Sequence, residues 1–228
     1  MSDKKRIVLS LFLVSFVILG LVGVKVYKDN EVRETIAIKR TLENKLLRFH
    51  VRGNSDNFED QDLKMAIRDR VLKYLSPKMN KCKTVEQSKK VINSHLTTIK
   101  NIAKAEVKNW NKNYTVSVYI GKSDFPTKRY GDLVFPAGKY EALQIVLGKG
   151  RGENWWCVMF PPLCLTDVVS GTVPYDGKKK IKDVIGTKYY VVIDQGDKKK
   201  HKAKVIGRFK IVELVEKGTH AFEKWISK

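Results

Sequence analysis

Residues 46–56 read LLRFHVRGNSD, and this segment is the starting point for predicting the fold of the chain around it. Leu47, Phe49 and Val51 alternate with three basic or imidazole side chains, which is the period of a half-buried strand. We therefore expect a strand here, with its apolar side chains facing a core and its polar ones facing outward.

The turn that follows this strand predicts a helix. Gly53-Asn54 breaks the strand, and Asn54 is suited to a left-handed turn. Ser55 or Asp56 can cap the helix, because Glu59 stands three residues after Asp56 in the capping-box position. Apolar residues then recur on one helical face as far as Pro77, which is expected to end the helix.

Further along the body, patterning predicts helices and strands in mixed order. Thr84 and Gln87 form a second capping-box pair, opening a helix that runs to about Lys108. The sequence then predicts a strand over 114–120, a loop over 121–128, a strand over 133–135, a helix over 140–147 and a strand over 155–160. The result is an α+β fold, with helices beside a small, largely antiparallel sheet.

The N-terminus carries an export signal. Residues 7–24 are uncharged, follow Lys4-Lys5-Arg6, and as a helix would extend about 27 Å, close to the thickness of a bilayer core. The basic flank should stay in the cytosol, which sends the rest of the chain outward. Residues 1–27 are a signal sequence or a membrane anchor. An uncleaved anchor is favoured, because no good small-x-small cleavage site follows.

The remaining chain divides by composition. Residues 28–44 are charged and read as a linker helix, and 45–169 form the α+β domain. Residues 170–228 form a Lys-rich C-terminal extension with 15 Lys+Arg against 7 Asp+Glu. Within it, 189–193 and 205–209 resemble strands, and a final helix is expected to end near Trp225.

The net charge of +21 comes from 45 basic and 24 acidic residues. Of the basic residues 35 are Lys and only 10 are Arg, and they are spread along the whole chain. Arg is the usual choice for phosphate and base-edge contacts, so no nucleic-acid partner is expected. A solvated lysine-rich surface is the first interpretation, and attraction to an anionic membrane or polymer is the second.

Polar residues cluster around the first turn without forming a recognisable site. Zinc sites normally use three or more ligands, and one histidine with two loose carboxylates does not supply them. On the following helix, Asp60 and Lys64 are spaced for an ion pair on a face that we expect to be solvated. The residues in question are His50, Asn54, Ser55, Asp56, Asp60, Gln61, Lys64, Arg68 and Asp69.

Two later segments also need interpretation. The Gly148–Gly152 loop is basic, but it lacks the order of a nucleotide-binding loop and reads as a plain turn. Cys157 and Cys164 flank Pro161-Pro162 and are expected to form a disulfide or a buried thiol pair, leaving Cys82 over. No nucleophile, metal or cofactor motif is present in the sequence, so no catalytic, metal or cofactor residue is assigned.

Three blocks resemble one known family, that of stage II sporulation protein R. They are residues 50–69 (HVRGNSD, then EDQDLK and RD), 129–143 (RYGDLVFPAGKYEAL) and 148–164 (GKGRGENWWCVMFPPLC). The resemblance covers about 45–167, and the Lys-rich tail departs from it. Besides the residues of the first turn and helix, it marks Tyr130, Gly131, Gly138, Tyr140, Asn154, Trp155, Trp156, Pro161 and Pro162 as candidate interaction residues.

The resemblance implies a signalling protein and not an enzyme. Members are made in the forespore and exported into the space between forespore and mother cell. There they activate a membrane-embedded aspartic protease, which removes the pro-sequence of a sporulation sigma factor. The residues alone leave two alternatives: an exported cell-wall or peptide hydrolase using His50, Asp56 and Asp60, or a protein that binds an anionic polymer or membrane surface.

Overall fold

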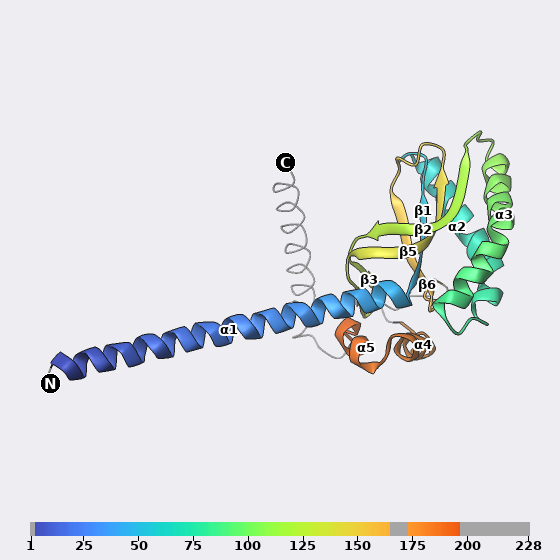
Figure 1. Ribbon diagram of the computed structural model, residues 1–228. Coiled ribbons are helices and arrows are strands. Elements are labelled where there is room, and N and C mark those ends of the chain that lie inside the picture. Colours follow the sequence, from blue (N-terminus) through green and yellow to red (C-terminus); the bar gives the residue numbers. More distant parts are fainter. Residues whose placement is uncertain (1–2, 165–172, 197–228) are drawn as a thin grey trace. The chain divides into compact units, whose positions relative to one another are not determined.

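The computed structural model describes residues 3–164 and 173–196 (Figure 1). It contains five helices and six strands in this part of the chain. In order they are α1 (Asp3–Lys45), β1 (Leu47–Arg52), α2 (Phe58–Met79), α3 (Val85–Asn109), β2 (Val116–Phe125), β3 (Lys128–Tyr130), β4 (Leu133–Phe135), β5 (Gly138–Leu147), β6 (Asn154–Phe160), α4 (Tyr175–Ile185) and α5 (Thr187–Ile193).

Helix α1 includes both the uncharged N-terminal run and the predicted linker helix. Its residues from Lys39 onward belong to one compact unit, and its preceding residues belong to another. Across the part of the chain that the structure describes, no helix combines the length and apolarity that crossing a bilayer demands.

The strands form a four-stranded sheet in the order β2-β5-β1-β6 and a separate β3-β4 pair. β1 runs parallel to β5, whereas the β1-β6 and β2-β5 pairs are antiparallel. The register places His50 between Gln144 on β5 and Trp156 on β6. The predicted α+β fold with a mostly antiparallel sheet is therefore confirmed.

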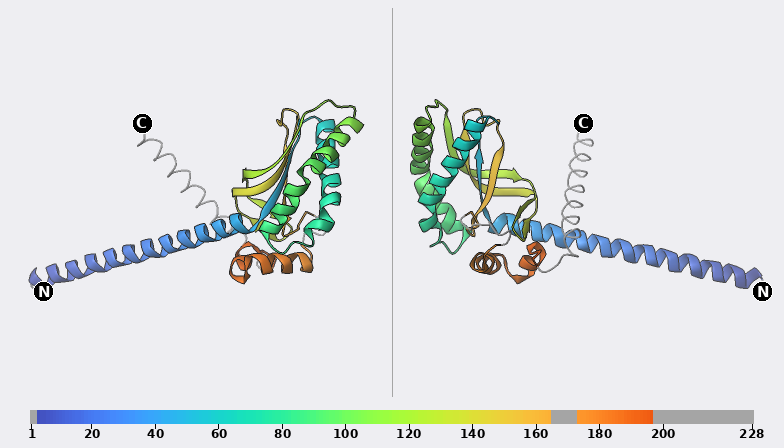
Figure 2. Two further views of the ribbon diagram at one scale, coloured as in Figure 1. Left: turned by 45° about the vertical axis from the view of Figure 1, so that its right-hand side comes forward. Right: turned by 180° about the vertical axis from the view of Figure 1, so that it is seen from behind.

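Helices α2 and α3 pack against each other and cover one face of the sheet (Figures 1 and 2). The predicted alternation holds on this face, because Phe49 of β1, Ile145 of β5 and Cys157 of β6 all point into the same core. Thr84 caps α3 as predicted, its side chain accepting a hydrogen bond from the Gln87 amide.

Two elements were predicted as the wrong type. Residues 140–147 form the central strand β5 and not a helix, because hydrogen bonding on both sides outweighs the local helical preference of Glu141-Ala142-Leu143. Residues 189–193 lie in helix α5 and not in a strand, although Tyr-Tyr-Val-Val is rich in strand formers. α5 instead buries Tyr190 and Ile193.

Two boundaries also differ from the prediction. Pro77 lies inside α2, which continues for two more residues to Met79, so the proline removes one i→i−4 hydrogen bond without ending the helix at once. The predicted 121–128 loop is largely strand, since β2 pairs with β5 as far as Phe125. The predicted strand over 205–209 and the final helix near Trp225 lie outside the described residues.

Candidate functional site

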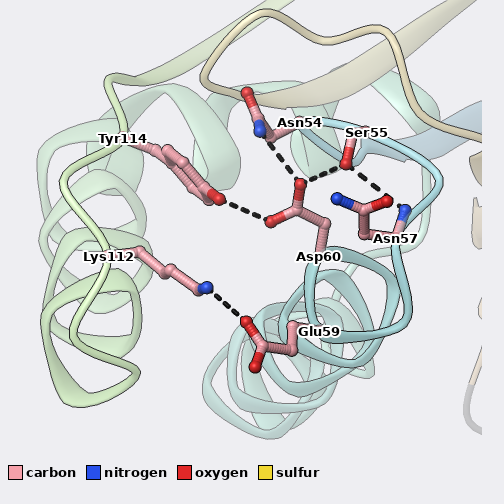
Figure 3. Close-up of polar contacts among 7 residues, drawn as sticks. All are labelled: Asn54, Ser55, Asn57, Glu59, Asp60, Lys112 and Tyr114. Carbon is pink, nitrogen blue, oxygen red and sulfur yellow. Dashed lines mark hydrogen bonds and ion pairs between the residues drawn. The ribbon is translucent and has the colours of Figure 1, made fainter.

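The turn between β1 and α2 is organised around the carboxylate of Asp60 (Figure 3). One carboxylate oxygen accepts from the Ser55 hydroxyl at 2.6 Å and the Asn54 amide at 2.9 Å. The other accepts from the Tyr114 hydroxyl at 2.7 Å, which ties this turn to the segment after α3. Only 3% of Asp60 is exposed, so these three donors replace its water shell.

These hydrogen bonds set the charge state of the carboxyl group. Burial alone would raise the pKa of Asp60, because it disfavours the charged form. Hydrogen bonds from Ser55, Asn54 and Tyr114 outweigh this effect and hold the pKa below its ordinary value. Asp60 is therefore a permanently ionised structural acceptor at neutral pH.

The predicted helix cap is replaced by a different arrangement. Asn57 occupies the N-cap position and makes no side-chain capping bond. Asp56 instead accepts a hydrogen bond from the Glu153 amide at 2.6 Å, and Ser55 donates to Asp60. Capping by Ser55 or Asp56 was therefore wrong, because the Ser55 side chain is engaged within the turn and the Asp56 side chain is engaged by Glu153.

The glycine-rich loop packs directly against this turn. The Gly152 amide donates to the Gly53 carbonyl at 3.0 Å, and the Lys149 amide donates to the Asn54 side chain at 3.0 Å. Gly148 has a φ of 54°, and a Cβ there would overlap Asn54. The loop is thus more than a plain turn: it holds the first and third sequence blocks together.

The charged face predicted on α2 is not solvated at its start. Lys64 is 5% exposed and donates to the Gln61 side chain and, at 3.1 Å, to the Glu153 carbonyl, in place of the predicted pair with Asp60. Burial lowers the pKa of Lys64. Arg68 pairs with exposed Asp69 at 2.6 Å and lies over the Trp155 ring at 5.0 Å.

The second face of the sheet buries a charge that the sequence analysis missed. Arg48 was placed on the outward side of its strand, yet it is fully buried. Its guanidinium lies 4.4 Å from the centre of the Phe125 ring and 5.0 Å from that of Tyr140. Its Nε donates to the Cys157 carbonyl at 2.9 Å, and its Nη2 donates to the Tyr130 hydroxyl at 3.0 Å.

His50 lies on the same face and is 1% exposed. Its ring stacks on Trp156 with 4.2 Å between ring centres, and its Nε2 lies 2.9 Å from the Asn154 side-chain oxygen. Burial lowers the pKa of His50 by disfavouring the imidazolium, and the Asn154 contact opposes this shift only in part. His50 is therefore a neutral core residue.

The middle sequence block closes this second face. The Tyr130 hydroxyl donates to the Trp156 carbonyl at 3.1 Å, and the Tyr140 hydroxyl donates to the Pro136 carbonyl at 2.9 Å. Burial raises the pKa of both tyrosines, so both stay protonated. Both glycines of this block are needed for structural reasons. Gly131 has a φ of 56° and makes the β3-β4 turn, and a Cβ on Gly138 would overlap the Glu43 side chain.

The end of β6 carries the two cysteines. The structure joins Cys157 and Cys164 in a disulfide, with their Cα atoms 5.7 Å apart. β6 ends at Phe160, directly before Pro161-Pro162. Trp155 and Trp156 are both half-buried, Trp155 meeting Phe49 edge-on at 5.6 Å.

The structure divides most of the predicted site residues between two clusters, one around Asp60 and one around Arg48 and His50. His50 contacts Asn154 and Trp156, whereas Asp60 binds the turn and Asp56 binds the backbone of Glu153. Among the described residues, no group of three or more His, Cys, Asp or Glu is placed to hold a metal ion. Sequence reasoning missed Arg48, Tyr114 and Phe125, because no motif or spacing marks them.

Comparison with known proteins matches the region of the chain that holds the three blocks. A family model described as Stage II sporulation protein R matches residues 43–170. A Bacillus subtilis (strain 168) protein named Stage II sporulation protein R is 38% identical over 168 residues, which is 74% of this chain and 74% of that protein. No solved structure gives a significant match.

Proposed function

The chain belongs to the stage II sporulation protein R family, a family of sporulation proteins, and from this we propose that it is an exported signal between compartments. It acts by binding a membrane-embedded aspartic protease of the mother cell. Binding triggers removal of the pro-sequence from a sporulation sigma factor. The observation that carries the proposal is the family match over 43–170, which contains both buried clusters.

Export is part of the same proposal and rests on the sequence. Residues 7–24 are uncharged and follow three basic residues, which favours translocation of everything after them. The body would then lie in the space between forespore and mother cell, anchored or released. A disulfide between Cys157 and Cys164 is compatible with such a compartment.

An activating role also fits how the side chains are used. Of the three residues that the hydrolase alternative uses, Asp60 and His50 are buried and occupied by structural contacts, and exposed Asp56 accepts from the Glu153 backbone amide. An activator needs only to bind the active form of the protease better than the inactive form. Moving a 1:99 equilibrium to 99:1 takes a difference of about 5.5 kcal/mol in binding free energy.

Co-expression in a non-sporulating bacterium tests this proposal. The chain, the protease and the pro-sigma factor are produced together, and cleavage is followed by immunoblotting. We expect cleavage only when all three are present. Cleavage that persists after the catalytic aspartates of the protease are replaced would instead make this chain the hydrolase.

A matched variant tests export in the same assay. Leu13→Asp with Ile18→Asp should block insertion, since each central charge costs about 2.5 to 3.5 kcal/mol. Cleavage should then be lost while the chain accumulates in the cytosol. Full cleavage by the retained variant would contradict the topology.

A further inference from the structure

A groove of about 810 Å³ runs between the second half of α3 and the start of β2. On the helix side it is lined by Lys100, Lys104 and Lys108, which are spaced four residues apart and exposed. Thr115, Val116 and Ser117 are among the residues that line the strand side. We call the three lysines the lysine ridge.

The lysine ridge has no acidic partner in the part of the chain that the structure describes. Lys112, the next lysine in the series, is paired with Glu59 (Figure 3). No described carboxylate forms an ion pair with Lys100, Lys104 or Lys108. Like charges four residues apart disfavour a helix, so an anionic ligand would relieve a repulsion that is built into α3.

β2 offers a second, independent feature beside this groove, because it is an edge strand of the sheet. The Thr115 carbonyl accepts from the Gly148 amide at 2.8 Å, and the register with β5 continues without a break to Phe125. The backbone groups of alternate residues of β2, such as half-buried Val118 and Ile120, must therefore point away from β5. Such an edge is a template for another strand.

We propose that an acidic peptide segment in extended conformation adds to β2 as a further strand, with its carboxylates on the lysine ridge. The open edge favours a peptide over a lipid surface, because headgroups would satisfy the lysines but not the backbone of β2. The proposal names a peptide chemistry and not the protein that carries it, so it does not depend on the proposed function.

Fluorescence anisotropy with the full chain in nonionic detergent tests the proposal. The probe is a fluorescein-labelled peptide, Glu-Val-Glu-Thr-Glu-Val-Glu-Thr-Glu. One control replaces every glutamate by lysine, and another methylates every backbone nitrogen. We expect the probe to bind saturably and neither control peptide to bind. Equal binding of the methylated peptide would overturn strand addition, because that peptide cannot donate to β2.

Two triple variants separate the lysine ridge from the overall charge. Lys100→Glu, Lys104→Glu and Lys108→Glu together should weaken probe binding by about tenfold or more. The matched control changes Lys179, Lys180 and Lys182 of α4 to Glu, which alters the net charge equally and should change binding by less than about twofold. Circular dichroism checks that both variants are folded.

The remaining outcomes decide against the proposal. An equal loss of binding in the two triple variants would reduce the effect to net charge. The lysine ridge would belong to a membrane-binding surface if two results came together. The wild-type chain would not bind the probe peptide, and the ridge variant would lose binding to phosphatidylglycerol vesicles. Unchanged probe binding by the ridge variant would place the peptide elsewhere.

Discussion

The two buried clusters hold opposite charges in different ways. Asp60 and Arg48 are 3% and 0% exposed, and neither forms a salt bridge with a described residue. Asp60 is satisfied by three neutral hydrogen-bond donors. Arg48 has two hydrogen bonds and several aromatic neighbours, and its Nη1 has no partner among the described residues.

This difference separates two structural roles. Asp60 connects chain segments, because its donors come from the turn after β1 and from the loop after α3. Arg48 fills space beneath Phe125 and Tyr140, so its contribution depends on packing as well as on charge. Replacing Arg48 by alanine should therefore lower the free energy of unfolding more than replacing Asp60 does.

The largest effect is expected for Arg48→Ala. Emptying the space among the aromatic rings and leaving the Cys157 carbonyl and Tyr130 hydroxyl without their donor should lower the free energy of unfolding by about 4 kcal/mol. Urea denaturation of the full chain in detergent measures this loss. Exposed Arg151 provides the control, since Arg151→Ala should have little effect. A smaller cost for Arg48→Ala than for Asp60→Ala would reverse the comparison.

Asp60→Ala should be next in size. It leaves the donors of Asn54, Ser55 and Tyr114 without their acceptor and should cost about 3 kcal/mol. The exposed neighbour Asp62 is the matched control, and Asp62→Ala should stay within about 0.5 kcal/mol. Equal costs for these two aspartates would show that the network contributes little.

The same residue predicts a dependence on pH. The pKa of Asp60 is lower in the folded protein than its ordinary value of 3.8, so the unfolded chain binds the proton more tightly. The contribution of Asp60 is therefore complete well above pH 3.8 and is lost as the pH falls through the folded pKa. Comparing unfolding curves of wild type and Asp60→Asn across this range should show a steeper acid loss in the wild type.

The disulfide should have a more modest effect. The disulfide closes a short loop between Cys157 and Cys164 and should add at most about 2 to 3 kcal/mol to the free energy of unfolding. A reductant should remove this contribution. Alkylation followed by intact-mass measurement on the purified chain checks the bond itself, with Cys82 as the internal free thiol. Labelling of both Cys157 and Cys164 without reductant would show that the two cysteines are not bonded to each other.

Asp56→Ala is expected to have the smallest effect. Asp56 is exposed and accepts one backbone hydrogen bond from Glu153, so its loss should cost about 1 kcal/mol. If signalling is lost while the unfolding free energy barely changes, Asp56 belongs to the binding surface.

Patterning predicted the helix-covered face of the sheet, because Leu47, Phe49 and Val51 alternate as a strand with one core should. Patterning predicted the second face of the sheet wrongly, because basic side chains that alternate with apolar ones normally point into solvent. The aromatic residues that cover Arg48, such as Phe125 and Tyr140, lie much later in the sequence. The turn was located correctly. Asp56 and Asp60 each have one partner, Glu153 and Tyr114 respectively, that lies too far along the chain for local capping rules to identify.

We propose that the family blocks act by building the domain, and that the proposed contact with the protease carries the signal. The most direct measurement is pro-sigma cleavage in the co-expression assay, plotted against the folded fraction for Arg48→Ala, Asp60→Ala and Asp60→Asn. The account predicts that cleavage falls in proportion to the folded fraction. A variant that is fully folded yet abolishes cleavage would contradict it and give that buried residue a direct part in the signal.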